Sequence, residues 1–169
     1  MKIFLIGFMG AGKTTLGGRL AIKLGYPFID LDKLIVEKTG QTIAEYFDAF
    51  GEKAFRKFER DTLQADFFPN DCVIATGGGA PCFYDNINWM NEAGITVYLS
   101  LSPKALAARL EKGKHKRPLI RDLSQEELIT YIEERLQERE KFYNQAKITV
   151  KGIDFTAEKV LEEVDAYLK

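Results

Sequence analysis

The stretch GFMGAGKTT at residues 7–15 follows the apolar run KIFLI and opens the helical pattern TTLGGRLAIKLG. It matches G-x-x-x-x-G-K-[ST] without deviation, and it has the strand before it and the helix after it that this pattern requires. Its glycines let consecutive N–H groups point at phosphate oxygens, and the helix N-terminus adds a favourable dipole. Lys13 would supply a point charge to the β- and γ-phosphates, and the Thr14 hydroxyl would complete a magnesium shell. The stretch predicts a triphosphate site between a strand and a helix.

Length and composition indicate one ordinary globular domain. The chain has 169 residues, of which 46% are hydrophobic and 29% charged, and it shows no internal repeat or linker. We therefore expect a single domain over residues 1–169. A net charge of −1 gives no argument for nucleic acid or an anionic membrane. We expect a cytoplasmic monomer with no nucleic-acid or membrane partner, whose Cys72 and Cys82 are reduced thiols.

Five short apolar segments alternate with longer amphipathic ones, which is typical of an α/β domain. The first and fourth segments are nearly continuous runs of Ile, Leu, Val, Phe and Tyr, and such runs suit strands covered by helices on both faces. The pattern predicts a three-layer α/β domain with a parallel sheet. The expected strands are Lys2–Ile6, Pro27–Asp30, Cys72–Ala75, Ile95–Leu101 and Ile148–Val150.

Several predicted helices have clear start and stop signals. SPKALAARLEKG has Ser102 as a cap and Gly113 at the stop, and the helix that follows Ser124 has Glu127 at capping-box spacing. In residues 42–68, apolar stripes on either side of Gly51 predict two successive helices. Their aromatic residues, Phe47, Phe50, Phe55 and Phe58 among them, are expected in the core, and the alternative that one or two also wall a pocket is open.

The segment EKGKHKRPLIRDLS at residues 111–124 interrupts this pattern, because it is strongly basic and has no apolar period. Without that period, we expect no core burial to hold it. Two interpretations are open. It is either a solvated surface loop or a mobile lid, at about residues 112–124, that closes arginines such as Arg117 over a polyanion.

The stretch FIDLD at residues 28–32 places two carboxylates where α/β sheets bind ligands. If the strand continues that far, Asp30 and Asp32 project to the same face. One could help to hold magnesium, and the other could accept a hydrogen bond or a proton from an attacking hydroxyl. The alternative is a solvated turn in which a carboxylate caps the helix that follows.

Glycines and arginines add a candidate acceptor site. GGG at residues 77–79 follows a buried strand and permits close approach to backbone N–H groups, although a tight turn is the alternative. Arg56, Arg117 and Arg139 could grip a small anion with their forked guanidinium groups. Arg135 and Arg139 are spaced i,i+4 on one predicted helix among glutamates, so surface ion pairs of these arginines with the glutamates are the alternative.

Taken together, GFMGAGKTT, FIDLD, FRKFE, GGGA, RPL and QEREKFY occur in the order and at about the spacing of the shikimate kinase family, and the chain resembles that family over nearly its whole length. The resemblance implies a nucleoside-monophosphate-kinase-like P-loop fold with five parallel strands and a mobile lid. It also implies an ATP-dependent kinase with Mg²⁺ that transfers the γ-phosphate to the 3-hydroxyl of shikimate, on the way to chorismate and the aromatic amino acids.

The resemblance implies which residues face the nucleotide. Six consecutive loop residues would hold the ATP phosphates, one lid arginine would reach them, a further arginine would lie near the nucleotide, and two oxygen-bearing side chains would bind the metal. The loop residues are Gly10, Ala11, Gly12, Lys13, Thr14 and Thr15. The lid arginine is Arg117, the arginine near the nucleotide is Arg109, and the metal-binding side chains are those of Thr14 and Asp30.

Toward the acceptor, the resemblance implies that Arg56 and Arg139 clamp the shikimate carboxylate and that Gly78 makes a backbone contact to the substrate. Asp32 would contact the shikimate hydroxyls and is the best candidate base, so Lys13, Asp32 and Arg117 are the expected catalytic residues.

One region departs from the family pattern. Family members often place a basic or polar residue after the last strand, near the adenine, whereas VKGIDFTAE offers only Lys151 before the final helix. Recognition of adenine through this loop is left to backbone contacts.

Three alternative functions would also use a P-loop. A gluconate kinase would also need arginines for a carboxylate, and a nucleoside monophosphate kinase would need a base pocket on its acceptor helices. A regulatory P-loop switch would carry a guanine-reading N-K-x-D string, which the sequence lacks. The ordered set of Asp32, Arg56, Gly78 and Arg139 suits a small polyhydroxy acid better.

Overall fold

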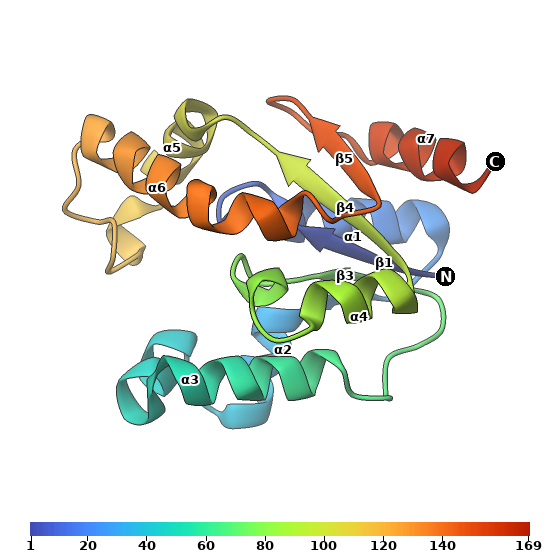
Figure 1. The fold of residues 1–169 in the computed structure, drawn as a ribbon, viewed down its shortest axis with the longest axis horizontal. Helices are drawn as coiled ribbons and strands as arrows, with labels where there is room; N and C mark the ends of the chain where they lie inside the picture. Colours follow the sequence, from blue (N-terminus) through green and yellow to red (C-terminus); the bar gives the residue numbers. More distant parts are fainter.

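The computed structural model describes all 169 residues and contains one sheet of five parallel strands in the order β2-β3-β1-β4-β5 (Figure 1). β1 lies at the centre, where Leu5 aligns with Ala75 of β3 and Val97 of β4. Every predicted strand is present, and only the ends of β2, β4 and β5 differ, by one residue each. The strands are β1 Lys2–Ile6, β2 Phe28–Asp30, β3 Cys72–Ala75, β4 Ile95–Ser100 and β5 Ile148–Lys151.

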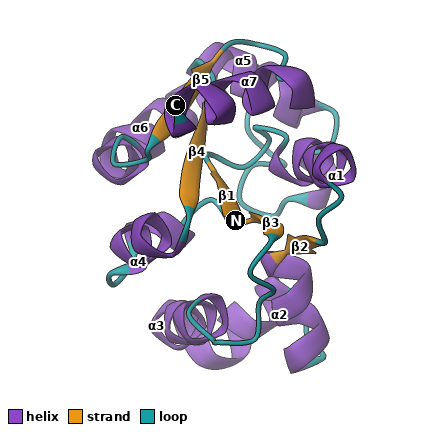
Figure 2. Ribbon diagram, turned by 90° about the vertical axis from the view of Figure 1, so that its right-hand side faces the viewer, coloured by secondary structure: helices purple, strands orange, loops and turns teal.

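Helices cover both faces of the sheet, which gives the expected three layers. α1 and α7 pack against each other on one face, α4 and α6 lie on the other, and α2 and α3 pack together beyond the β2 edge (Figure 2). The middle strands are buried on both faces for this reason, whereas side chains of the edge strand β5 alternate between buried and exposed. The helices are α1 Lys13–Leu24, α2 Leu31–Thr39, α3 Ile43–Leu63, α4 Asn86–Ala93, α5 Pro103–Glu111, α6 Gln125–Tyr143 and α7 Ala157–Leu168, with short 3₁₀ turns at η1 Ala80–Cys82 and η2 Lys114–Lys116.

The predicted helix signals are present as local hydrogen bonds. The Ser102 hydroxyl accepts from the backbone N–H of Ala105 at 3.1 Å, so it caps α5. Ser124 and Glu127 form the expected capping box of α6. α5 nevertheless ends two residues before Gly113. None of the helices combines the length and the apolar composition needed to cross a membrane.

α3 is bent at Gly51, where φ is 83° and ψ 169°, so the prediction of two successive helices is confirmed. Of its aromatic residues, Phe55 is buried in the core, as expected. Phe50 is 60% exposed, so its assignment to the core was wrong. The bend turns Phe47 toward Phe55, with 4.8 Å between ring centroids, and Phe47 also lines a cavity, as the alternative allowed.

The stretch FIDLD does not continue as a strand, so the alternation argument for its carboxylates was wrong. β2 ends at Asp30, whose carboxylate accepts a hydrogen bond from the backbone N–H of Lys33 at 3.2 Å and caps α2. An aspartate at this position favours a helix start because it satisfies an N–H that has no partner within the helix. Asp32 therefore belongs to the first turn of α2.

The basic segment before α6 is better anchored than its sequence predicts. Ile120 is fully buried, which corrects the expectation that the core holds none of this segment. Lys114 donates to the Leu123 carbonyl at 2.8 Å and pairs with Glu111 at 2.9 Å. These contacts fix the two ends of the segment, while Arg117 and Leu119 between them are exposed.

Candidate active site

The loop between β1 and α1 has the conformation that the motif predicts. Gly10 and Gly12 have φ of 81° and 92°, in the left-handed region that glycine adopts without strain. A Cβ atom at Gly12 would lie 2.7 Å from Nη2 of Arg109, so that guanidinium lies directly beside the loop. The loop leads directly into α1, whose N-terminus favours an anion.

Lys13 folds back across this loop. Its Nζ donates to the carbonyls of Gly7 at 2.5 Å and Phe8 at 3.0 Å, and the residue is only 8% exposed. Burial lowers the pKa of Lys13 to about 8, against the opposing effect of the Asp32 carboxylate. A phosphate beside Nζ would restore the ordinary pKa and stabilise the charged form.

A hydroxyl and a carboxylate meet at the start of α1. Thr14 Oγ1 donates to Oδ2 of Asp30 at 2.8 Å. Both groups are oxygen ligands of the kind that Mg²⁺ prefers. No group of three or more acidic, histidine or cysteine side chains is placed to hold a metal. Mg²⁺ usually takes one or two protein ligands and completes its shell with water and phosphate oxygens. The pair therefore fits the metal.

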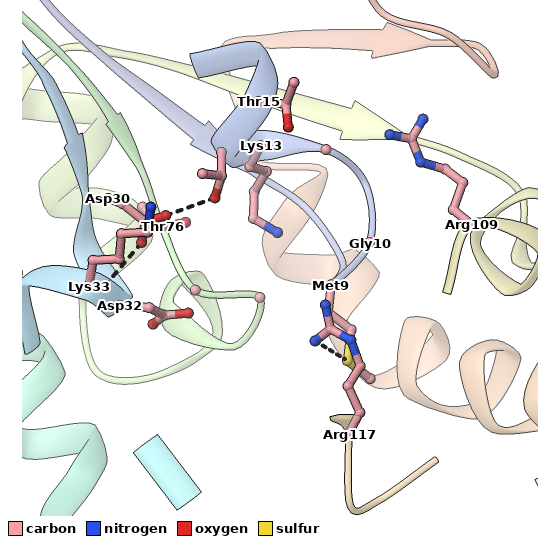
Figure 3. A pocket seen from close by; sticks show the side chains of 14 residues that line it. Met9, Gly10, Lys13, Thr15, Asp30, Asp32, Lys33, Thr76, Arg109 and Arg117 are labelled. Carbon is pink, nitrogen blue, oxygen red and sulfur yellow. Dashed lines mark hydrogen bonds between the residues drawn. The ribbon is translucent and has the colours of Figure 1, made fainter. Parts of the chain in front are cut away.

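The P-loop, Asp30, Asp32 and one residue of the basic segment before α6 line a cavity of about 430 Å³ (Figure 3). In Figure 3 the Lys13 amine and the Asp32 carboxylate both point into it, while Arg117 approaches from the basic segment and donates to the Met9 sulfur at 3.8 Å. Burial, and next the charge of Asp30, raise the pKa of Asp32. The lining residues are Met9, Gly10, Gly12, Lys13, Thr14, Thr15, Asp30, Asp32, Lys33, Thr76, Gly77, Gly78, Arg109 and Arg117.

A second cavity, of about 520 Å³, contains both candidate arginines of the acceptor site, Arg56 on α3 and Arg139 on α6. Arg139 makes no ion pair, whereas its neighbour Arg135 pairs with Glu138 at 3.1 Å. The surface ion-pair alternative therefore describes Arg135 and is wrong for Arg139. The lining residues are Phe47, Glu52, Arg56, Cys82, Phe83, Leu119, Tyr131, Arg135, Glu138, Arg139, Lys141 and Phe142.

Glu59 and Phe83 hold Arg56 in place, and sequence reasoning missed both. The Arg56 Nη1 donates to Oε1 of Glu59 at 2.9 Å, and the guanidinium lies 4.2 Å from the centre of the Phe83 ring. Burial raises the pKa of Glu59 to about 7, although the Arg56 charge acts against this rise. Glu59 could have been found from its i,i+3 spacing to Arg56 in FRKFE. No sequence signal linked Phe83 to an arginine 27 positions earlier.

The glycine turn Gly77–Gly79 lies between the two cavities, and the site uses its lack of side chains. A Cβ atom at the first glycine would lie 2.8 Å from Oδ1 of Asp32, at the second 3.3 Å from Nη1 of Arg139, and at the third 2.5 Å from Nη2 of Arg56. Three charged groups therefore converge on bare backbone. The turn lies between the cavity at the P-loop and the cavity that contains Arg56 and Arg139.

Arg109 extends the site in the other direction. Arg109 lines the cavity at the P-loop and a third cavity, of about 790 Å³, that also includes Ile153 and Asp154. Its Nη1 donates to the Ile153 carbonyl at 3.2 Å. The loop after β5 thus borders this cavity with the Ile153 carbonyl, the Ile153 side chain and Asp154.

A P-loop before α1, a Thr–Asp pair suited to a metal, and an adjoining cavity lined by arginines are the features of a P-loop kinase of small molecules. The family model described as shikimate kinase matches residues 9–169. The chain is 47% identical to a shikimate kinase of Parabacteroides distasonis over 98% of this chain and 93% of that protein. It is 38% identical to one of Enterococcus faecalis over 99% and 98%.

Solved structures agree with this assignment. The shikimate kinase of Bacteroides thetaiotaomicron superposes with a TM-score of 0.91 at 42% identity, covering 99% of this chain and 98% of that one. The Acinetobacter baumannii shikimate kinase in complex with shikimate gives a TM-score of 0.81 at 34% identity, covering 99% and 92%. The chain belongs to the shikimate kinase family. It is an ATP-dependent kinase that uses Mg²⁺ and phosphorylates shikimate.

Proposed function

We propose that this protein transfers the γ-phosphate of ATP to the 3-hydroxyl of shikimate across the glycine turn Gly77–Gly79. The observation that carries this proposal is the convergence at that turn of Asp32 from the phosphate side with Arg56 and Arg139 from the acceptor side. A ring acid gripped by its carboxylate at the arginines would present its hydroxyls toward Asp32. The donor phosphates would lie in the adjoining cavity.

The donor half of the site combines backbone N–H groups with the positive charges of Lys13 and a bound metal ion. The N–H groups of Gly10–Thr15 and the α1 N-terminus hold the phosphates, and Lys13 leaves the loop carbonyls to pair with them. Thr14 and Asp30 would hold Mg²⁺, which would supply positive charge to neutralise the phosphate oxygens. Arg109 guides the nucleotide toward the cavity at Ile153.

The acceptor half depends on the planar fork of the two guanidinium groups. Arg56 and Arg139 bind the carboxylate of shikimate, because a fork matches two carboxylate oxygens better than a point charge does. Arg56 reaches this position already held by Glu59 and Phe83, so little side-chain entropy is lost on binding. Gly78 adds a backbone contact to the substrate.

Asp32 acts at the reacting hydroxyl. It orients the 3-hydroxyl and accepts its proton as the new O–P bond forms and the bond between the γ-phosphorus and the bridging oxygen of ADP breaks. A pKa raised by burial makes this carboxylate a better proton acceptor than an exposed aspartate. Arg117 approaches from the lid to stabilise charge on the transferred group, and lid closure excludes water.

The protein acts as a cytoplasmic monomer, and its ligands are small molecules. Its net charge of −1 and its locally basic lid suit a site for small polyanions better than a broad nucleic-acid surface. Light scattering after size exclusion measures the oligomeric state, and a dimer mass would overturn this part of the proposal.

A coupled ADP-release assay across shikimate, gluconate and nucleoside monophosphates tests the reaction. Shikimate is expected to give saturable ADP release, and the Lys13→Ala variant gives the background. A flat response to shikimate, or a higher kcat/KM with gluconate, would overturn the acceptor assignment.

A further inference from the structure

The glycine turn has an unusual division of its backbone hydrogen bonds. The N–H groups of Gly77–Gly79 donate to no acceptor in the protein, whereas all three carbonyls of the turn are engaged. The first carbonyl accepts from the N–H of Ala80 at 3.1 Å and the third from that of Cys82 at 2.9 Å. The central one, that of Gly78, accepts from the hydroxyl of Tyr143 at 2.5 Å. Free donors beside two arginines suit an oxygen-rich ligand.

The Tyr143 contact differs from the other two because it comes from a distant element. Tyr143 ends α6 and lies 65 residues from the glycine that it contacts. It is fully buried and stacks on Tyr98, with 4.9 Å between ring centroids. Arg139 precedes it by one turn on α6. The same helix therefore supplies a carboxylate clamp and an anchor for the turn.

Peptide geometry connects this anchor to the free donors. All peptide bonds are trans, so the carbonyl of Gly78 and the N–H of Gly79 point in opposite directions. A carbonyl held toward buried Tyr143 leaves that N–H directed away from the Tyr143 hydroxyl. Burial raises the pKa of Tyr143, so its hydroxyl stays protonated and remains a donor throughout the neutral range.

We propose that Tyr143 is a positioning residue for the acceptor: its hydroxyl fixes the peptide between Gly78 and Gly79, aims the free N–H groups of the turn at shikimate and sets their distance from Arg139. This inference rests on the proposed function and extends it to a residue that touches neither substrate. Without the hydroxyl, the peptide unit gains freedom that shikimate binding must then remove.

The test is Tyr143→Phe, which removes one oxygen and keeps the ring that stacks on Tyr98. The KM for shikimate, and its Kd by calorimetry without ATP, should rise about 5- to 10-fold, which corresponds to one hydrogen bond. The KM for ATP should stay within about twofold, because the P-loop is untouched. Tyr98→Phe is the matched control, since it removes a hydroxyl from the same stack and should leave both constants unchanged.

Three results would overturn the inference: an unchanged Kd for shikimate in Tyr143→Phe, an equal rise of both KM values, or the same Kd change in Tyr98→Phe. A measurement on the wild-type protein keeps the test valid if the variant does not fold. Shikimate should shift the NMR amide resonances of Gly78 and Gly79, and unshifted resonances would refute the proposal. Absence of turnover with shikimate in the wild type would instead refute the proposed function.

Discussion

The replacement Gly79→Ala tests the acceptor site with a single methyl group. Gly79 has φ of −87°, which alanine adopts freely, so the backbone tolerates the change. The added Cβ would lie 2.5, 2.7 and 2.8 Å from Nη2, Nη1 and Cζ of Arg56. These distances are below van der Waals contact, so the guanidinium must move. Because the atoms belong to the end of a flexible side chain, the fold should adapt at little cost.

The magnitude follows from what the guanidinium loses when it moves. The ring centres of Phe83 and Phe55 lie 4.2 and 5.3 Å from the guanidinium carbon, so they limit how far the group can move away from Gly79. The movement therefore breaks the 2.9 Å bond to Glu59 or the alignment with the substrate carboxylate. A charge-assisted hydrogen bond contributes about 1.5–3 kcal/mol, so the KM for shikimate should rise about 10- to 150-fold. The KM for ATP should change little, and the melting temperature should fall only to the extent that buried Glu59 loses its partner.

Steady-state kinetics with each substrate varied in turn, together with thermal unfolding, give the answer. Gly18→Ala is the matched control, because a Cβ at that helical position meets nothing closer than 4.0 Å. It should stabilise the protein by about 0.5–1 kcal/mol and leave both KM values unchanged. A KM for shikimate within twofold of the wild type in Gly79→Ala would refute the placement of Arg56 at the substrate carboxylate.

Three further predictions concern the charged groups of the site. Asp32→Asn should lower kcat about 10²- to 10⁴-fold in the ADP-release assay, as expected for a general base, and an unchanged kcat would exclude that role. Arg139→Lys should raise the KM for shikimate by about 10-fold or more while that for ATP stays constant, because a point charge cannot reproduce the fork; equal rises would place the clamp elsewhere. Burial raises the pKa of Glu59 from 4.5 to about 7, so between these values the folded protein keeps a proton that the unfolded chain releases. The stability from this carboxyl is therefore gained as pH falls from about 8 to about 5, by up to about 3 kcal/mol. Urea denaturation across that range should show a weaker pH dependence for Glu59→Gln, and parallel curves would contradict the assignment.

Most of the helices and strands could be predicted from local sequence patterns. The motif around Lys13, the continuous apolar strands and the capping signals at Ser102 and Ser124 act within a few residues of themselves, so they are readable without tertiary structure. Gly51 shows the same, because a break in helical periodicity is a local property. FIDLD was harder, since an aspartate after a short strand either extends the strand or caps a helix. In the structure the Asp30 carboxylate caps α2, so the helix begins directly after Asp30.

The sequence by itself determined the donor site and the residue types available for an acceptor. A P-loop is one contiguous stretch, so the order of its residues is enough to predict phosphate binding. Only the tertiary structure separated the contacts of Arg135 from those of Arg139, because Arg135 pairs with Glu138 whereas Arg139 makes no ion pair and reaches the glycine turn. The contacts of Phe83 with Arg56 and of Tyr143 with Gly78 join elements distant along the chain. They arise from packing three layers around one sheet edge, and no local periodicity records such contacts.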